Sequence, residues 1–274
     1  MDDINTKASV DEIDGARAYD NLHVPALLQQ WAPLMVEAAD IGSGDSVLDV
    51  ACGTGILARE VAKQVGDRGS VSGLDASAGM LAVARQLEPL IEWREGIAES
   101  LPYEDNSFDA VVSQFGLMFF QNRPVALSEM LRVLQPKGRM AIAVWESLDK
   151  SLAYPLIVAM IERLAGPDAA NALRAPFVLG ETEKLLTLFQ QARAHSVRIK
   201  SHVGKAQFPS IKSLVEADLR GWLPIMNVYL DENLIQSILV EAEIVLGQYV
   251  TQDGTVEFEM PAHIITAIKS AHCG

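Results

Sequence analysis

Cysteine and long hydrophobic runs are scarce in this sequence. Only two of its 274 residues are cysteines, Cys52 and Cys273, and they offer neither a disulfide framework nor a metal-ligand spacing. The most notable apolar stretch, residues 115–120, is far shorter than the roughly 20 residues that a membrane helix needs. The chain opens with acidic and polar residues, without the basic start of a secretory signal. We therefore expect a cytoplasmic protein with no metal and no membrane partner.

Positive charge is scarce as well. Lysine and arginine number 22 against 36 aspartates and glutamates, which gives a formal net charge of -14. A protein with this negative charge repels the phosphate backbone of a nucleic acid, and the basic residues are scattered singly. We therefore exclude nucleic acid as a general partner. Aromatic residues make up only 6% of the chain and hydrophobic residues 49%. This balance is typical of an α/β enzyme with a substantial core.

Strand-like and helix-like segments alternate between residues 46 and 145. Short apolar runs are separated by segments with apolar residues at helical spacing. The expected strands are 46–50, 70–74, 90–94, 108–114 and 140–145, and the expected helices are 54–65, 77–87 and 123–134. Alternation of this kind is typical of right-handed parallel crossovers, and it predicts a doubly wound α/β sheet.

The pattern changes on both sides of this region. Residues 22–39 predict one or two helices, and residues 181–194 predict another. Residues 195–208 and 255–268 alternate like strands. The two helical stretches between these strands have the character of an inserted cap; they are 211–220 and 232–246. The whole chain therefore predicts a mostly parallel, seven-stranded Rossmann-like sheet with helical cap insertions.

These patterns divide the chain into five expected parts. They are an N-terminal helical lid (1–40), a cofactor-binding core (41–147), a helical connection (148–180), the remainder of the sheet domain (181–209 and 255–270) and a helical cap insertion (210–254). No Pro/Gly/Ser-rich linker separates them, so we expect the extra helices to pack on the sheet domain.

The segment from Val47 to Gly55 combines a strand, an acid and a glycine turn. Gly53 and Gly55 let the backbone adopt positive φ and approach a ligand closely, and the helix that follows directs its free N–H groups to the same place. Asp75 lies 20 residues after Gly55, at the end of the second expected strand. A carboxylate there can accept hydrogen bonds from both hydroxyls of a ribose. The segment predicts a cofactor that contains a ribose.

Three interpretations of this turn remain. Gly53, Gly55 and Ala58 also fit the dinucleotide pattern G-x-G-x-x-G/A, which by itself is a weak signal. Asp49, four residues before the first glycine, favours S-adenosylmethionine, because an anion there suits a sulfonium and an amino group and repels a pyrophosphate. A structural turn without a ligand is the third interpretation.

Four ordered motifs make residues 45–145 similar to the class I S-adenosylmethionine-dependent methyltransferases, with the closest likeness to the ubiquinone/menaquinone-biosynthesis-like branch. The motifs have the family's spacing; they are Val47–Gly55, Gly73–Ser77 with Met80, Leu101–Tyr103 before Ser107–Asp109, and Arg132–Gly138. The resemblance implies transfer of the methyl group of S-adenosylmethionine to a small-molecule acceptor, with S-adenosylhomocysteine as product.

The resemblance also implies roles for individual residues around the methionine and ribose parts of the cofactor. Backbone at Ala51, Gly53 and Gly55 is expected to hold the methionine part. Asp49 is expected to support its amino group, and Asp75 to bind the ribose.

The adenine and the methyl group have their own expected neighbours. Met80, or backbone beside Ala76, is expected to cover the adenine, and Ser113 is expected to end the fourth strand under the methyl group. Ile97 and Ala98 stand in the loop at the adenine edge. Family members often place an acid where Ile97 stands, to accept a bond from the adenine amino group, and an isoleucine cannot do this.

The acceptor side is less defined by the sequence. Tyr19 lies in a region that commonly folds over the cofactor in this family, and it is expected to cover the methionine end or to serve packing. Residues 115–120 line an acceptor pocket or belong to the core. The same alternatives apply to four further residues, Trp145, Trp222, Met226 and Tyr229. Of the five histidines only His23 is of interest, because it lies near Tyr19.

In-line methyl transfer depends chiefly on alignment of the nucleophile with the methyl carbon, and the sequence singles out no general base. The catalytic residue is therefore unknown at this stage. Two rival functions are a nicotinamide-dependent oxidoreductase, which Asp49 opposes, and a non-catalytic protein that binds S-adenosylmethionine, which Ile97 keeps open. A homodimer is compatible with the sequence.

Overall fold

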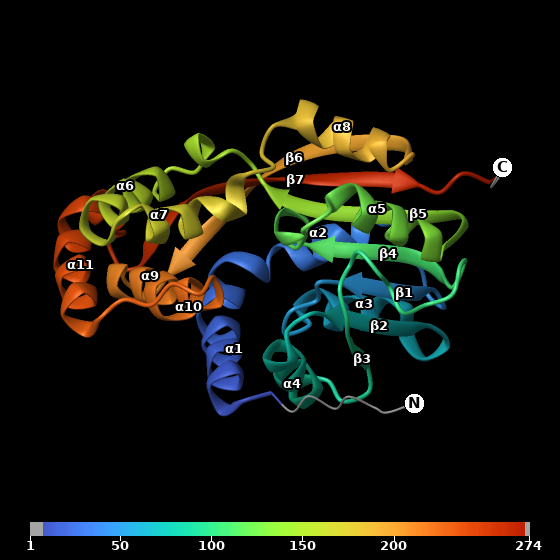
Figure 1. The fold of residues 1–274 in the computed structure, drawn as a ribbon, viewed down its shortest axis with the longest axis horizontal. Coiled ribbons are helices and arrows are strands. Elements are labelled where there is room, and N and C mark those ends of the chain that lie inside the picture. The colour runs from blue at the N-terminus through green and yellow to red at the C-terminus, as the bar shows by residue number, and fades with distance from the viewer. Residues whose placement is uncertain (1–7, 272–274) are drawn as a thin grey trace.

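Seven strands form one continuous sheet (Figure 1). The computed structural model describes residues 8–271, so His272, Cys273 and the first seven residues of the expected lid lie outside the described part. The strands are β1 (Ser46–Val50), β2 (Ser70–Asp75), β3 (Glu92–Glu95), β4 (Phe108–Gln114), β5 (Leu134–Trp145), β6 (His195–Phe208) and β7 (Val256–Ile268). Their order is β3-β2-β1-β4-β5-β7-β6, with β7 antiparallel to both neighbours and the other pairs parallel. The predicted α/β class and sheet are confirmed.

The middle of the sheet consists of β1 and β4. Strand β4 is buried on both faces, as its apolar character predicts, and β1 beside it is buried as well. In the register, Asp49 of β1 lies opposite Gly73 of β2 and opposite Val112 of β4. The carboxyl ends of β1, β2 and β4 therefore meet at one edge. Ligands bind at this edge in open α/β sheets, where the strand order reverses.

Helices cover both faces of the sheet. Crossovers between parallel strands are right-handed, and the strand order reverses after β1. As a result, the helices that precede β4 lie on one face of the sheet and those that follow β4 lie on the other. The first group is α2 (Trp31–Ala38), α3 (Ile56–Val65) and α4 (Ala78–Leu87), and the second is α5 (Arg123–Val133) and α8 (Thr182–Gln191). The expected helix 54–65 begins only at Ile56, because Gly55 is its left-handed N-cap.

The remaining helices form a cap beside the carboxyl ends of the strands (Figure 1). They come from two separate parts of the chain: α6 (Tyr154–Ala165) and α7 (Pro167–Arg174) follow β5, whereas α9 (Ile211–Glu216), α10 (Leu223–Ile225) and α11 (Glu232–Val245) lie between β6 and β7. Helix α11 contacts both α6 and α9, and α7 contacts α10, so the two parts pack together. The expected helix 211–220 ends at Glu216 and continues as a π-helical segment, Ala217–Trp222.

Helix α1 (Val10–His23) runs between the cap and the sheet domain (Figure 1). Ser9 and Glu12 begin it with a reciprocal capping box. The helix contacts α4 on one side and the π-helical segment Ala217–Trp222 on the other. A second π-helical segment, Val24–Leu28, leads from α1 towards α2. Among residues 8–271, no helix has both the length and the apolar character to span a membrane.

Candidate functional site

The turn after β1 is held in an unusual backbone conformation. Ala51, Gly53 and Gly55 all have positive φ, at 57°, 55° and 86°. The turn is fixed by Cys52 N–H, which donates to Leu74 O at 3.0 Å, and by Gly55 N–H, which donates to Cys52 O at 2.9 Å. It brings the N-terminus of α3 to the carboxyl edge of the sheet, as the glycine spacing predicts.

The two glycines of the turn face different neighbours. A β-carbon on Gly53 would have its nearest neighbour, Tyr19 Cε1, at 4.0 Å, so it would meet only an ordinary contact on the side of the turn towards α1. A β-carbon on Gly55 would lie 2.3 Å from the Trp93 ring. Gly55 is therefore required by packing as well as by its φ, a constraint that the sequence pattern did not reveal.

Asp75 connects this turn to the start of α4. Its Oδ2 accepts a hydrogen bond from Gly53 N–H at 2.8 Å, and its Oδ1 accepts one from Ser77 N–H at 2.9 Å. Burial raises the pKa of the Asp75 carboxyl, and these backbone donors oppose the rise. Each carboxylate oxygen retains acceptor capacity, so the group can still accept bonds from ribose hydroxyls.

Asp49 is buried beside the turn, with only 1% of its surface exposed. Its Oδ2 accepts a hydrogen bond from Ala58 N–H at 3.0 Å, whereas its Oδ1 has no partner among residues 8–271. Burial raises the pKa of Asp49 well above its usual value, and the nearby Asp75 raises it further. A buried carboxylate of this kind is costly unless a cation pairs with it.

The neighbouring strand end carries a second unpaired polar group. Ser113, in β4, is fully buried, and its Oγ is without a hydrogen-bond partner in the described part of the chain. Native proteins rarely leave buried polar atoms unpaired. Asp49 and Ser113 lie on adjacent strands, and each holds a buried polar atom that a ligand could pair; the unpaired carboxylate oxygen of Asp49 suits an ammonium group.

The loop after β3 lies beside Asp75, because Gly96 N–H donates to Asp75 O at 3.0 Å. In this loop the Ile97 side chain is 54% exposed and Ala98 is buried. Met80, in the first turn of α4, is half-buried, and Ala76 is exposed. These residues follow Asp75 or lie in the loop bonded to it, and their role around an adenine stays a prediction.

Tyr19 of α1 lies over the glycine turn. Its ring stacks on the ring of His23 with centroids 5.5 Å apart. The neighbouring Asp20 accepts a hydrogen bond from Thr54 Oγ1 at 2.6 Å, which ties α1 to the turn. Burial and the nearby Asp75 raise the pKa of Tyr19, which keeps its hydroxyl protonated. Helix α1 therefore forms a cover over the turn.

Comparison with known proteins identifies the family. A methyltransferase domain matches residues 48–142. The chain is 33% identical to demethylmenaquinone methyltransferase from Shouchella clausii over 211 residues, which is 69% of this chain and 88% of that protein. This chain belongs to the S-adenosylmethionine-dependent methyltransferases. Its cofactor is S-adenosylmethionine.

Other relatives of this methyltransferase agree with that assignment. It is 38% identical to 2-phytyl-1,4-beta-naphthoquinone methyltransferase from Arabidopsis thaliana over 165 residues, which covers 56% of this chain and 63% of that protein. The match thus spans less than two thirds of the plant protein. The structure of phosphoethanolamine N-methyltransferase 2 from Haemonchus contortus, in complex with S-adenosylhomocysteine, superposes with a TM-score of 0.59 at 18% identity, over 94% of this chain and 57% of that one.

The strand order also opposes the dinucleotide interpretation. Dinucleotide-binding sheets have the order 3-2-1-4-5-6 with parallel strands. In this methyltransferase the antiparallel β7 lies between β5 and β6. The G-x-G-x-x-A pattern of residues 53–58 is therefore a property of the methyltransferase turn.

A cavity lies between the sheet edge, α1 and the cap. It holds about 90 Å³, several times the space of roughly 10–15 Å³ that one water needs by the same measure. Phe115 and Trp145 stack in its wall with ring centroids 3.8 Å apart. Five further aromatic residues line it: Tyr19, Phe119, Tyr154, Phe177 and Trp222. The cavity adjoins the carboxyl ends of β4 and β5.

The structure sorts the residues for which the sequence left pocket and core as alternatives. Phe115, Phe119, Trp145 and Trp222 line the cavity, whereas Leu117 and Met118 are core. Met226 is half-buried against the core. Tyr229 is 75% exposed, so both expectations for it are wrong. The loop between α10 and α11 carries it away from the cavity.

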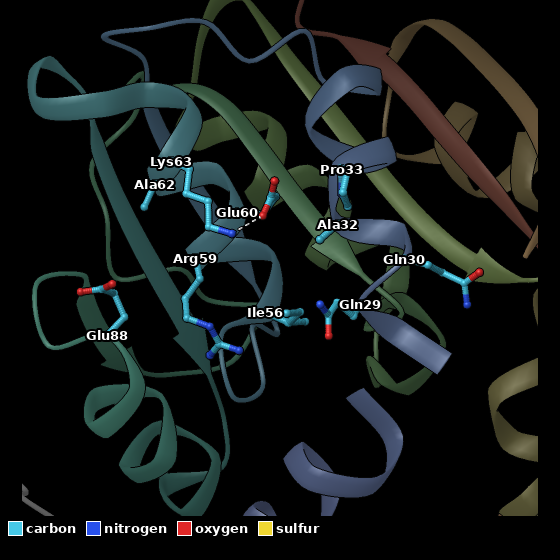
Figure 2. Close-up of a pocket in the computed structure, with 10 residues that line it drawn as sticks. All are labelled: Gln29, Gln30, Ala32, Pro33, Ile56, Arg59, Glu60, Ala62, Lys63 and Glu88. Carbon is cyan, nitrogen blue, oxygen red and sulfur yellow. Dashed lines mark hydrogen bonds and ion pairs between the residues drawn. The ribbon is translucent and has the colours of Figure 1, made fainter. Parts of the chain in front are cut away.

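A second, larger hollow of about 610 Å³ lies between α2 and α3, and Figure 2 shows the residues that line it. Its lining mixes apolar and polar side chains, and it includes Gln29, Arg59 and the ion pair of Lys63 with Glu60 at 2.7 Å. The hollow lies beside α2 and α3 and shares no lining residue with the cavity described above. Of the two, only the smaller cavity is lined by aromatic residues.

Four functional or supporting residues were missed at the sequence level. Trp93 packs on the glycine turn, Asp20 ties α1 to it, and Tyr154 and Asp218 reach the cavity from the cap. The only signal in the sequence is that Asp218 stands at helical spacing from Leu214, Val215 and Trp222, on an otherwise apolar face. No motif marks the others, because each acts through a contact with a residue distant in the chain.

Proposed function

We propose that this methyltransferase transfers the methyl group of S-adenosylmethionine to a small planar aromatic acceptor of the hydroquinone class, by in-line displacement. The observation that carries the proposal is the aromatic cavity beside the glycine turn, at the ends of β4 and β5. Flat rings such as Phe115 and Trp145 suit stacking with a flat acceptor. Two relatives named for naphthoquinone and demethylmenaquinone methylation support this acceptor class.

Asp49, Ser113 and the turn hold the methionine part in this proposal. The unpaired Oδ1 of Asp49 accepts a bond from the ammonium group, which removes the cost of the buried carboxylate. Backbone at Ala51, Gly53 and Gly55 lies along the methionine chain, and the Ser113 hydroxyl lies under the reacting end. Tyr19 covers this end from α1 and limits the access of water.

Asp75 and the residues around it hold the adenosine part. Asp75 binds the ribose hydroxyls, and Met80 with backbone at Ala76 covers the adenine. Since Ile97 cannot accept a hydrogen bond through its side chain, backbone of Ile97 and Ala98 contacts the adenine edge.

The rate of methyl transfer depends on how the acceptor is placed relative to the methyl group. S-adenosylmethionine supplies an electrophilic methyl group on a sulfonium. The chain contributes alignment of the acceptor with that group, which is the larger part of the rate in an in-line displacement. It also excludes water through α1 and the cap.

A direct assay tests the proposal. We expect the protein to bind S-adenosylhomocysteine by calorimetry and to release it from S-adenosylmethionine in the presence of a naphthohydroquinone with one short prenyl chain, kept reduced with dithionite. Asp75→Asn serves as the cofactor-site variant, and Asp67→Asn, in the exposed segment Gly66–Arg68, as the matched control. Turnover of a polar amine such as phosphoethanolamine in place of the hydroquinone would contradict the acceptor class.

A further inference from the structure

Three polar side chains meet in the wall of the otherwise apolar cavity. His23 comes from the end of α1, Asp218 from the π-helical segment of the cap, and Tyr154 from the start of α6. His23 Nε2 lies 3.6 Å from Asp218 Oδ1, and the Tyr154 hydroxyl donates to the same oxygen at 3.5 Å. His23 is 5% and Asp218 3% exposed. All three line the cavity.

His23 and Asp218 make few of the hydrogen bonds that their side chains could make. Both ring nitrogens of His23 and Oδ2 of Asp218 are buried without a hydrogen bond to any part of residues 8–271. Burial raises the pKa of Asp218, and the neighbouring His23 opposes the rise. Leaving such groups unpaired costs free energy that an apolar residue of similar size would avoid. The arrangement suits a ligand that completes the hydrogen bonds.

The backbone is distorted where these two residues stand. His23 directly precedes the π-helical segment Val24–Leu28, and Asp218 lies within the other π-helical segment. Segments of this kind are rare and occur frequently at functional sites. Gly221, in the second segment, packs closely on the imidazole, since a β-carbon there would lie 3.1 Å from His23 Cε1 and 3.5 Å from Nδ1.

His23 also lies close to the cofactor turn. The ring of Tyr19 stacks on the imidazole of His23. The same tyrosine ring is the nearest neighbour of a β-carbon placed on Gly53. One aromatic ring therefore separates the imidazole from the backbone assigned to the methionine part. No other histidine reaches this region among the residues described, because His263 is bonded to Ser201 and Gly180, and His195 and His202 lie on β6.

We propose that His23 accepts a proton from a hydroxyl group of the aromatic acceptor and that Asp218 positions its imidazole; this rests on the function proposed above. With Nε2–H directed to Asp218, Nδ1 carries the free lone pair of an imidazole that lines the cavity. Hydrogen bonds of catalytic pairs are often long without substrate and shorten in the complex, which accommodates the 3.6 Å separation.

The step is balanced as follows. The acceptor O–H bond breaks, an N–H bond forms on the imidazole, and the electron pair stays on the acceptor, which becomes the nucleophile. As the deprotonated acceptor oxygen bonds to the methyl carbon, the carbon–sulfur bond breaks and its electron pair remains on sulfur, giving S-adenosylhomocysteine. The imidazolium faces the Asp218 carboxylate until the proton passes to solvent.

The first test measures turnover of the prenylated naphthohydroquinone. We expect His23→Gln to lower kcat by about 100-fold or more, the usual range for a lost general base, with unchanged affinity for S-adenosylhomocysteine and an unchanged melting temperature. Added imidazole restores activity to His23→Ala. His195→Gln, on exposed β6, is the matched control. Full activity of His23→Gln overturns the proposal.

The second test needs no turnover. Para-nitrophenol is added to the protein saturated with S-adenosylhomocysteine, below the pKa of the free phenol. We expect the wild type to show the absorption of the phenolate, which His23→Gln lacks and Asp218→Asn shows in smaller amount. A wild-type spectrum that stays that of the neutral phenol overturns the proposal. Phenolate formation without methylation of the naphthohydroquinone supports the His23 role and counts only against the proposed acceptor.

Discussion

The indole ring of Trp93 occupies the place where a side chain on Gly55 would begin. A β-carbon on Gly55 would lie 2.3 Å from Trp93 Cη2, and the φ of Gly55 is 86°. Trp93 is itself fixed, because its Nε1–H donates to Glu88 O at 2.8 Å. A side chain of the edge strand β3 thus packs directly on the cofactor turn. Gly55 is needed both for the positive φ of the turn and for the packing of Trp93.

Gly55→Ala is expected to destabilise the fold. A positive φ costs alanine about 1 kcal/mol, and overpacking against Trp93 adds about 1–3 kcal/mol. Gly53→Ala meets only Tyr19 at 4.0 Å, so it should lower stability less and affinity for S-adenosylhomocysteine more. Urea unfolding and calorimetry of both variants separate the two effects. Equal stability of the two variants would show that Trp93 does not confine Gly55.

Asp49→Asn is expected to separate stability from binding. The change removes a buried carboxylate that lacks a cation in the protein alone, so the free energy of unfolding should stay the same or rise. Affinity for S-adenosylhomocysteine, which carries the ammonium group, should fall at least about tenfold, or about 1.4 kcal/mol. Asp67→Asn, on an exposed turn, is the control. Unchanged affinity in Asp49→Asn would refute the proposed role.

Cofactor affinity is expected to depend on pH through Asp49 and Asp75, whose pKa values burial raises. A raised native pKa favours the protonated folded form, so these groups contribute stability at low pH that is lost as pH rises through their native values. Binding has the opposite sign, because an ammonium group and ribose hydroxyls bind the ionised carboxylates. Affinity for S-adenosylhomocysteine should therefore fall as pH is lowered, and less so in Asp49→Asn. Calorimetry across a pH series checks this, and a flat wild-type profile would contradict it.

Phe119→Ala is expected to raise the KM for the acceptor. Phe119 lines the cavity, is 41% exposed and packs on Trp222 with ring centroids 5.3 Å apart. Its removal should cost about 1 kcal/mol of stability or less, since an aromatic pair adds about 0.5–1.5 kcal/mol. Affinity for S-adenosylhomocysteine should not change. Leu152→Ala, which is 52% exposed outside the cavity, is the control, and an equal KM in both variants would exclude Phe119 from the acceptor site.

Local signals in the sequence predicted the sheet domain well. The strand, glycine turn and acid of residues 47–55, and Asp75 after the next strand, are signals between near neighbours, and parallel crossovers then bring the two strand ends together. The boundaries were less accurate. Strand β5 begins at Leu134, six residues before the expected start, because Leu134 pairs with Phe108 ahead of an irregularity in the register.

The sequence by itself therefore determined the α/β sheet and the position of the cofactor turn, because periodicity, glycine spacing and acids after strands depend on adjacent residues. Only the tertiary structure decided that Trp93 confines Gly55, that Tyr229 points to solvent, and that His23 of α1 meets Asp218 of the cap 195 positions later. The physical reason is that the cap and α1 are positioned by packing between distant segments, and burial alone reveals which of their polar groups lack partners.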